Sequence, residues 1–172
     1  MTATVVEPGT IRFERLLPGP VERVWAFITE SDKRARWLAG GEFELRVGGK
    51  VRLEFDHACL SSDKIPPAKY KDMGKPRVDG VMTRYEPMRV LAHTWAWDGS
   101  DTEVTYELSP RGQETLLVIT HRRMPSRDGT LSVMSGWDAH TGILEDVLRG
   151  VEPRPFWRTH AALEKQYSEA VT

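Results

Sequence analysis

Aromatic and titratable side chains gather on one face of the segment GWDAHTGILEDVLRG. Its apolar spacing predicts an α-helix, in which residues three, four and seven positions apart lie on the same side. Trp137, His140, Thr141 and Leu144 therefore share a face. Leu144 fits ordinary core packing, but aromatic side chains mixed with a few polar groups are typical of a small-molecule pocket. This face is either core or the wall of a cavity.

Histidines on two neighbouring strands are expected to approach the same interior space. The alternation in VLAHTWAW places His93 on the same side as Trp95 and Trp97, and ETLLVITHR directs His121 inward by the same parity. Together with His140, these histidines could suit acid–base chemistry or proton-sensitive ligand binding. Hydrogen-bonded structural histidines are the commoner arrangement. We keep His121 and His140 as candidate general bases.

Patterns for metal binding and nucleophilic catalysis are weak. His57-Ala58-Cys59 has no second ligand pair at a zinc spacing, and the single cysteine, Cys59, excludes an internal disulfide. Cys59 also lacks a base nearby in the sequence, and no serine lies in a nucleophile-elbow pattern. We therefore expect neither a metal nor a cofactor.

The overall charge argues against polyanionic partners. The 172 residues include 24 Lys and Arg against 25 Asp and Glu, so no positive field would concentrate nucleic acid or anionic lipid. The N-terminal stretch lacks the basic start and apolar run of a secretion signal, and no later window approaches membrane-spanning length. We expect a cytoplasmic monomer or homodimer that binds neither nucleic acid nor membranes.

Tryptophan is abundant for a small domain, with six in the chain. Trp37, Trp95, Trp97 and Trp137 provide flat apolar area that suits an aromatic or lipid-like ligand. We assign the other two, Trp25 and Trp157, to the core and to the C-terminal helix.

The elements that must position these residues follow from periodicity and turn residues. Strand alternation begins in TIRFERLL, and two short helices follow it before Gly40-Gly41. FELRVGGKVRLEF predicts a hairpin with Phe43, Leu45 and Val47 buried on its first arm. Residues 57–77 form a long irregular loop, which is either functional or a surface excursion. Further strands and a helix over 132–149 complete an α+β domain.

We expect one domain with three parts. Residues 1–9 form a flexible N-terminus, residues 10–150 the folded domain, and residues 151–172 a helical extension that packs on it. Short turns between the later strands favour antiparallel neighbours, giving a curved sheet of about six to seven strands that covers the long C-terminal helix.

The pattern resembles the START-like, or SRPBCC, superfamily and its bacterial branch of homologues of the activator of the heat-shock-protein-90 ATPase. The resemblance runs from Thr10 to about Tyr167. It is carried by PVERVWAFIT with RARWLA, FELRVGGKVRLEF, GVMTRYEPMRVLAHTWAW, TEVTYEL, TLLVITHRRMP and GWDAHTGILEDVLRG. It implies a helix-grip fold with a cavity between the sheet and the long helix.

The first functional hypothesis is a protein that binds a small hydrophobic or aromatic molecule in this cavity. The alternatives are a cyclase- or hydrolase-type enzyme that uses the cavity histidines, and a co-chaperone-like module that binds a protein partner. The candidate ligand-binding residues are Trp37, Phe55, His93, Trp95, Trp97, Tyr106, His121, Trp137, His140, Thr141 and Leu144.

Overall fold

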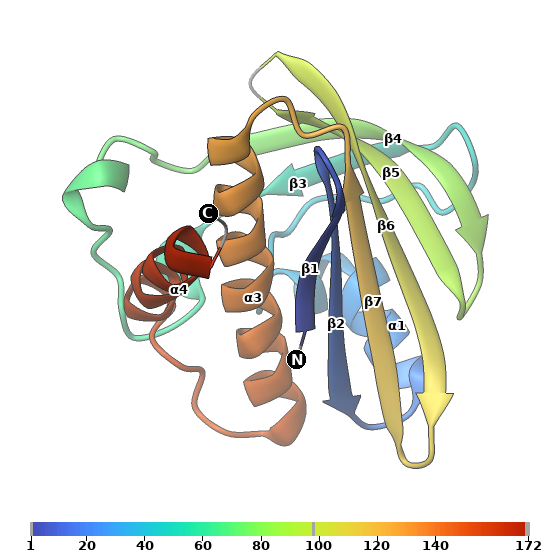
Figure 1. Cartoon of the computed structure of the whole chain (residues 1–172). Coiled ribbons are helices and arrows are strands. Elements are labelled where there is room, and N and C mark those ends of the chain that lie inside the picture. The colour runs from blue at the N-terminus through green and yellow to red at the C-terminus, as the bar shows by residue number, and fades with distance from the viewer. Residues whose placement is uncertain (1, 98, 171–172) are drawn as a thin grey trace.

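The structure is a computed structural model that describes residues 2–97 and 99–170. One antiparallel sheet of seven strands curves around the long helix α3, Arg127–Arg149, and a final helix α4, Phe156–Ala170, packs beside it (Figure 1). The strand order is β1-β2-β7-β6-β5-β4-β3. The strands are β1 Thr2–Glu7, β2 Thr10–Pro18, β3 Lys50–Glu54, β4 Arg77–Glu86, β5 Val90–Trp97, β6 Ser100–Arg111 and β7 Glu114–Arg122.

Short helices fill the connections. Helices α1, Val21–Thr29, and α2, Ser31–Arg34, follow β2, and α1 contacts β6 and β7. The loop after β3 contains the single turns η1, His57–Cys59, and η2, Ala68–Tyr70. The helix-grip arrangement predicted from the sequence is confirmed, including the two short helices before the main body of the sheet.

The N-terminus differs from the prediction. Residues 2–7, expected to belong to a flexible segment, form β1 and pair with β2 from Thr2↔Glu14 to Glu7↔Thr10. Val5 and Val6 are exposed on this edge strand. Its short run of valines carries little alternation, so the sequence pattern gave no strand there. Residue 1 lies outside the described residues.

The first arm of the predicted hairpin over 42–56 forms no regular strand. It still pairs with β3 through the isolated bridges Gly40↔Glu54 and Phe43↔Val51 and through backbone hydrogen bonds of 2.9 Å from Glu44 N–H to the Lys50 carbonyl and from Arg52 N–H to the Glu42 carbonyl. The turn at Gly48-Gly49 also forms two backbone hydrogen bonds of 2.8 Å with Met82 of β4. Phe43 is buried as predicted, but the prediction is wrong for Leu45 and Val47, which are 41% and 63% exposed. The sheet still has seven strands because β1 takes the place of this arm.

A buried ion network fixes the helices on the sheet. Arg15 of β2 donates to Asp138 at 2.9 Å and to Glu145 at 2.7 Å, both on α3. Tyr167 of α4 donates its hydroxyl to the other Asp138 oxygen at 2.6 Å. Because one carboxylate serves both β2 and α4, the network sets the spacing between the sheet, α3 and α4.

The inward face of the sheet forms the core against α3. The register aligns His121 of β7 with Ile11 of β2 and Val104 of β6, all buried.

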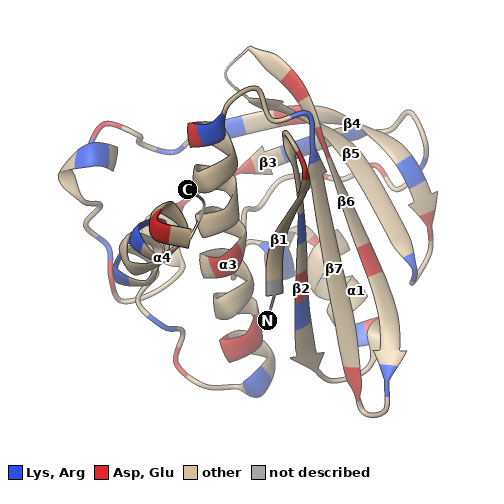
Figure 2. Cartoon of the chain, viewed as in Figure 1, with Lys and Arg blue, Asp and Glu red and all other residues tan. Residues whose placement is uncertain are grey.

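Basic and acidic residues are interspersed along the strands, loops and helices (Figure 2). Among the described residues, no helix combines the length and apolar character that crossing a membrane requires.

Candidate functional site

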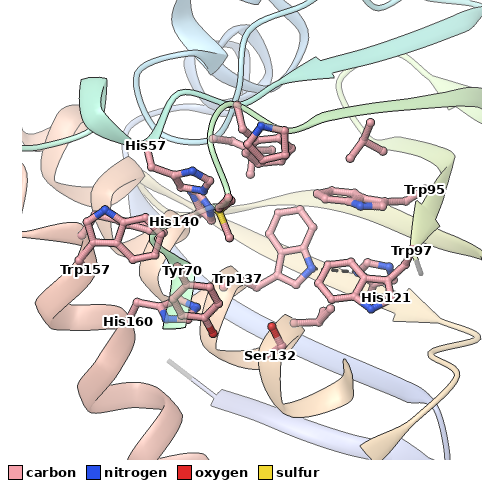
Figure 3. A pocket seen from close by; sticks show the side chains of 18 of the residues that line it. His57, Tyr70, Trp95, Trp97, His121, Ser132, Trp137, His140, Trp157 and His160 are labelled. Atoms are coloured by element: carbon pink, nitrogen blue, oxygen red, sulfur yellow. Dashed lines mark hydrogen bonds between the residues drawn. The ribbon is translucent and has the colours of Figure 1, made fainter. Parts of the chain in front are cut away.

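A cavity of about 280 Å³ lies between the sheet, α3, α4 and the loop after β3 (Figure 3). This volume is roughly twice that of a buried cavity known to hold benzene, so it has room for about two aromatic rings. Its walls are mainly aromatic or aliphatic, with histidines between them. The lining residues are Leu38, Phe55, His57, Tyr70, Met73, Pro76, Val78, Trp95, Ala96, Trp97, His121, Ser132, Val133, Gly136, Trp137, His140, Phe156, Trp157 and His160.

Helix α3 contributes one continuous strip of this wall. The strip consists of residues three and four positions apart, a spacing that keeps side chains on one side of a helix, and its members are Ser132, Val133, Gly136, Trp137 and His140. A Cβ atom at Gly136 would have no heavy atom within 4 Å. The glycine therefore leaves a gap in the helix wall where a larger side chain would project into open space.

The structure separates the predicted site residues into two groups. Phe55, Trp95, Trp97, His121, Trp137 and His140 line the cavity. The others are absent from its lining and lie in the surrounding core. These are Trp37, His93, Tyr106, Thr141 and Leu144, which are all at most 1% exposed.

In several residues of the second group, the polar atoms are already bonded to other parts of the protein. The Trp37 indole donates to the Phe27 carbonyl at 2.7 Å. His93 Nε2 contacts the Tyr106 hydroxyl at 3.2 Å, so these two satisfy each other inside the sheet. Thr141 donates to the Trp137 carbonyl, one turn back in α3, at 2.6 Å.

His121 lines the cavity but has both ring nitrogens engaged. The Thr102 hydroxyl donates to the Trp95 carbonyl at 2.7 Å, so its oxygen accepts from Nε2–H of His121 at 2.7 Å. Nδ1 of His121 accepts from the Trp137 indole at 3.1 Å. Burial, followed by the nearby His93, lowers the pKa of His121 to about 3. His121 is thus a neutral, fully bonded group.

His140 has a different environment. Its Nδ1 lies 2.8 Å from the Trp37 carbonyl, which accepts only, so Nδ1 carries the hydrogen and Nε2 has the lone pair. Burial, followed by the neighbouring His57, lowers the pKa of His140 to about 3. The ring is therefore neutral at physiological pH.

The structure gathers a different histidine group from the one predicted. His57 lies 5.7 Å from His140 between ring centroids and 5.2 Å from Trp157. His160 of α4 lies 5.4 Å from Tyr70 in an edge-on arrangement. Burial lowers the pKa of His57 to about 4, and it lowers that of His160 as well.

Two polar atoms at this end of the cavity are buried without a hydrogen-bond partner among the described residues. They are Nδ1 of His57 and Nε1 of Trp157. An unpaired buried polar atom costs about 1–3 kcal/mol, so this end of the cavity is the less stable part of its wall.

The loop after β3 is held against α4. The Tyr70 hydroxyl donates to Glu164, and Lys69 Nζ lies 3.1 Å from the same oxygen. The Phe156 amide donates to Ser61 Oγ at 3.0 Å, so the start of α4 is also tied to the loop. The loop and α4 together close one side of the cavity.

Sequence patterns gave little sign of these contributors. Tyr70, Met73 and Pro76 lie in a segment without periodicity, and their only signal was the unusual length of the loop. Phe156, Trp157 and His160 fall at helical spacing after Pro155, which indicates a buried face but not the element that it meets. Among the described residues, no group of three or more His, Cys, Asp or Glu side chains is arranged to hold a metal ion.

Comparisons with known proteins agree with this architecture. The chain is similar to the protein encoded by BPP1335 of Bordetella parapertussis, with 43% identity over 98% of this chain and 89% of that one, at a TM-score of 0.82. CalU16 of Micromonospora echinospora has 23% identity over 93% and 86%, at a TM-score of 0.69. A conserved protein of unknown function from Enterococcus faecalis has 22% identity over 99% and 89%, at 0.66.

The last two likenesses show the fold alone. No curated protein matched the sequence. The model of the family described as "Activator of Hsp90 ATPase homolog 1-like protein" matches residues 18–149, which is most of the chain. The chain therefore belongs to the Activator of Hsp90 ATPase homolog 1-like family.

Proposed function

We propose that this protein binds a small aromatic or hydrophobic molecule in the cavity between the sheet, α3 and α4. The observation that carries the proposal is the cavity itself, about 280 Å³ in volume and walled by aromatic rings from β5, α3, α4 and the loop. Excluding water from these rings provides affinity, and a few polar groups orient the ligand. The family and its structural neighbours share a fold suited to ligand binding.

The wall is rigid where the tryptophans meet. Trp95 and Trp137 pack edge to face with their centroids 5.7 Å apart, and the Trp137 indole is held by His121. A ligand therefore meets a preformed aromatic surface and orders few side chains when it binds, which favours affinity.

The geometry gives little support to the enzyme alternative. A general base works best when its pKa lies near the working pH, and burial lowers the pKa of both His121 and His140 to about 3. His121 also has no free nitrogen, because Thr102 and Trp137 occupy both.

Filling the gap at Gly136 tests the binding proposal. Gly136→Leu should project a side chain into the cavity without a clash at its Cβ atom. We expect 2-methoxynaphthalene, a neutral aromatic probe, to give saturable shifts of the Trp137 indole signal in ¹H–¹⁵N spectra of the original protein, and no saturation in Gly136→Leu.

Ala162→Leu is the matched control because Ala162 is an exposed α4 residue away from the cavity lining. It should bind the probe like the original protein. Equal binding by Gly136→Leu would place the ligand elsewhere. Absence of binding by every form would contradict the proposal and favour a role in protein interaction.

A further inference from the structure

His140 presents one hydrogen-bond acceptor to the cavity. The Trp37 carbonyl holds Nδ1–H, and no described residue bonds Nε2. The buried side-chain atoms that lack a hydrogen-bond partner do not include Nε2, so this unbonded nitrogen keeps some accessible surface. The residue as a whole is 6% exposed. Because His140 lines the cavity, the remaining accessible surface of its ring faces that space.

Neighbouring rings fix the direction of this acceptor. The His140 ring lies 4.7 Å from Phe156, 5.7 Å from His57 and 6.0 Å from Phe55, measured between centroids. Reversing the imidazole would also break the bond from Nδ1–H to the Trp37 carbonyl, which favours the orientation observed. A lone pair, and not an N–H, therefore faces the ligand.

The described lining contains no Asp, Glu, Lys or Arg. Its titratable bases are histidines, and burial lowers the pKa of His57 to about 4 and that of His140 to about 3. Lys69, which precedes the lining residue Tyr70, is paired with Glu164, and neither Lys69 nor Glu164 lines the cavity. A carboxylate or ammonium group inside would be buried without a counter-charge, which is strongly unfavourable.

We propose that the ligand is an uncharged aromatic molecule with a hydroxyl group, and that this hydroxyl donates to Nε2 of His140. The inference rests on the proposed function, since it names the ligand class of the same cavity. The aromatic part lies against Trp95 and Trp137, and the hydroxyl lies toward the end formed by His140 and Phe156. Long-chain carboxylates are excluded by the uncharged lining.

Three naphthalenes of similar size separate the alternatives at pH 7. 2-Naphthol has a hydroxyl donor, 2-methoxynaphthalene has an oxygen without a donor, and 2-naphthoate carries a negative charge. Dissociation constants come from the same ¹H–¹⁵N titration. We expect 2-naphthol to bind about ten-fold more tightly than 2-methoxynaphthalene, the usual effect of one hydrogen bond. 2-Naphthoate should bind most weakly.

Two variants identify the partner of the hydroxyl. In His140→Asn the side-chain amide still donates to the Trp37 carbonyl, but the Nε2 acceptor is lost. The preference for 2-naphthol over 2-methoxynaphthalene should fall to about one-fold, because the ratio of the two dissociation constants isolates the lost hydrogen bond from any change in ring packing. Ser132→Ala is the matched control because Ser132 is another polar lining residue on α3, and it should leave the ten-fold preference unchanged.

The outcomes distinguish this inference from the binding proposal. If 2-methoxynaphthalene or 2-naphthoate binds as tightly as 2-naphthol, the ligand class is wrong while the cavity still binds aromatics. If Ser132→Ala removes the preference and His140→Asn keeps it, His140 is not the acceptor. If none of the three probes binds, both proposals are overturned. The probe series on the original protein decides the ligand class even if His140→Asn does not fold.

Discussion

The Trp137 indole of α3 donates a hydrogen bond to Nδ1 of His121 on β7 at 3.1 Å. This bond continues through Nε2 of His121 to Thr102 and the Trp95 carbonyl, which joins the helix to two further strands. The cavity wall and the sheet are thus one hydrogen-bonded unit, and a ligand contacts side chains whose positions are already set.

Removing this indole donor should destabilise the protein. Trp137→Phe keeps an aromatic ring but leaves Nδ1 of the buried His121 without a partner, which costs about 1–3 kcal/mol. Trp25→Phe is the matched control, because Trp25 is also buried and its indole makes no hydrogen bond to the described residues. Urea unfolding should show a larger loss of unfolding free energy for Trp137→Phe. Equal losses would mean that the hydrogen bond contributes nothing.

Two glycines of α3 should respond differently to alanine. At Gly136 a methyl group meets open space, so Gly136→Ala should raise the unfolding free energy by roughly 0.5–1 kcal/mol through helix propensity. At Gly142 the same methyl would lie 2.8 Å from Nη1 of Arg154, whose guanidinium pairs with Asp146. Gly142→Ala should therefore stabilise less or destabilise. Thermal unfolding of both variants measures the difference, and a larger gain at Gly142 would contradict it.

Stability should fall as the pH drops below about 6.5, because buried histidines resist protonation. Burial lowers the pKa of His93 to about 4 and those of His121 and His140 to about 3 in the folded chain. The unfolded chain binds protons near pH 6.5, so it is favoured from there down to the folded pKa values. Each histidine changes the unfolding free energy by at most about 1.4 kcal/mol per pH unit.

Urea unfolding at pH 7, 6 and 5 measures that slope. His121→Gln should lose about one histidine's share of the pH dependence, whatever its effect on stability at pH 7. An unfolding free energy that stays constant between pH 7 and pH 5 would show that these histidines bind protons as readily in the folded chain as in the unfolded chain.

The loop after β3 should loosen when its contact with α4 is cut. Glu164→Ala removes the acceptor shared by Tyr70 and Lys69. This should lower the free energy of local opening of the loop by about 1 kcal/mol, so that exchange from the open state becomes roughly five-fold faster. Hydrogen exchange at the amides of Tyr70 and Met73, which bond to backbone carbonyls within the loop, reports this opening. Glu169→Ala, at an exposed position on the same helix, is the control and should leave the exchange rates unchanged.

Local patterns in the sequence determined most of the fold. Alternation predicted the strands from β4 to β7, and the three- and four-residue spacing of Trp137, His140 and Leu144 predicted the inward face of α3. These features depend on neighbours within one element, because burying one face of a strand or helix requires apolar residues at its own period. The same parity correctly directed His93 and His121 inward.

The tertiary structure decided which residues along an inward face line the cavity and which pack in the core. Leu144 shares a face with His140, yet it packs in the core one turn further along α3. Periodicity specifies the side of an element on which a residue lies, and it carries no information on where a cavity begins or ends. The alternation of Leu45 and Val47 was misleading for a related reason, since it predicted a whole buried face for an arm in which only Phe43 reaches the core.

The polar end of the site was likewise decided only by tertiary contacts. His57 reaches His140 from an irregular loop and Phe156 reaches it from the last helix, while Tyr70 of the loop stacks on Trp157 of that helix. The loop and α4 are joined by contacts such as Tyr70 to Glu164, 94 positions apart. The sequence by itself determined which residues are aromatic or titratable and which faces they occupy. Packing of distant segments decided which of them meet, because such contacts have no local period in the sequence.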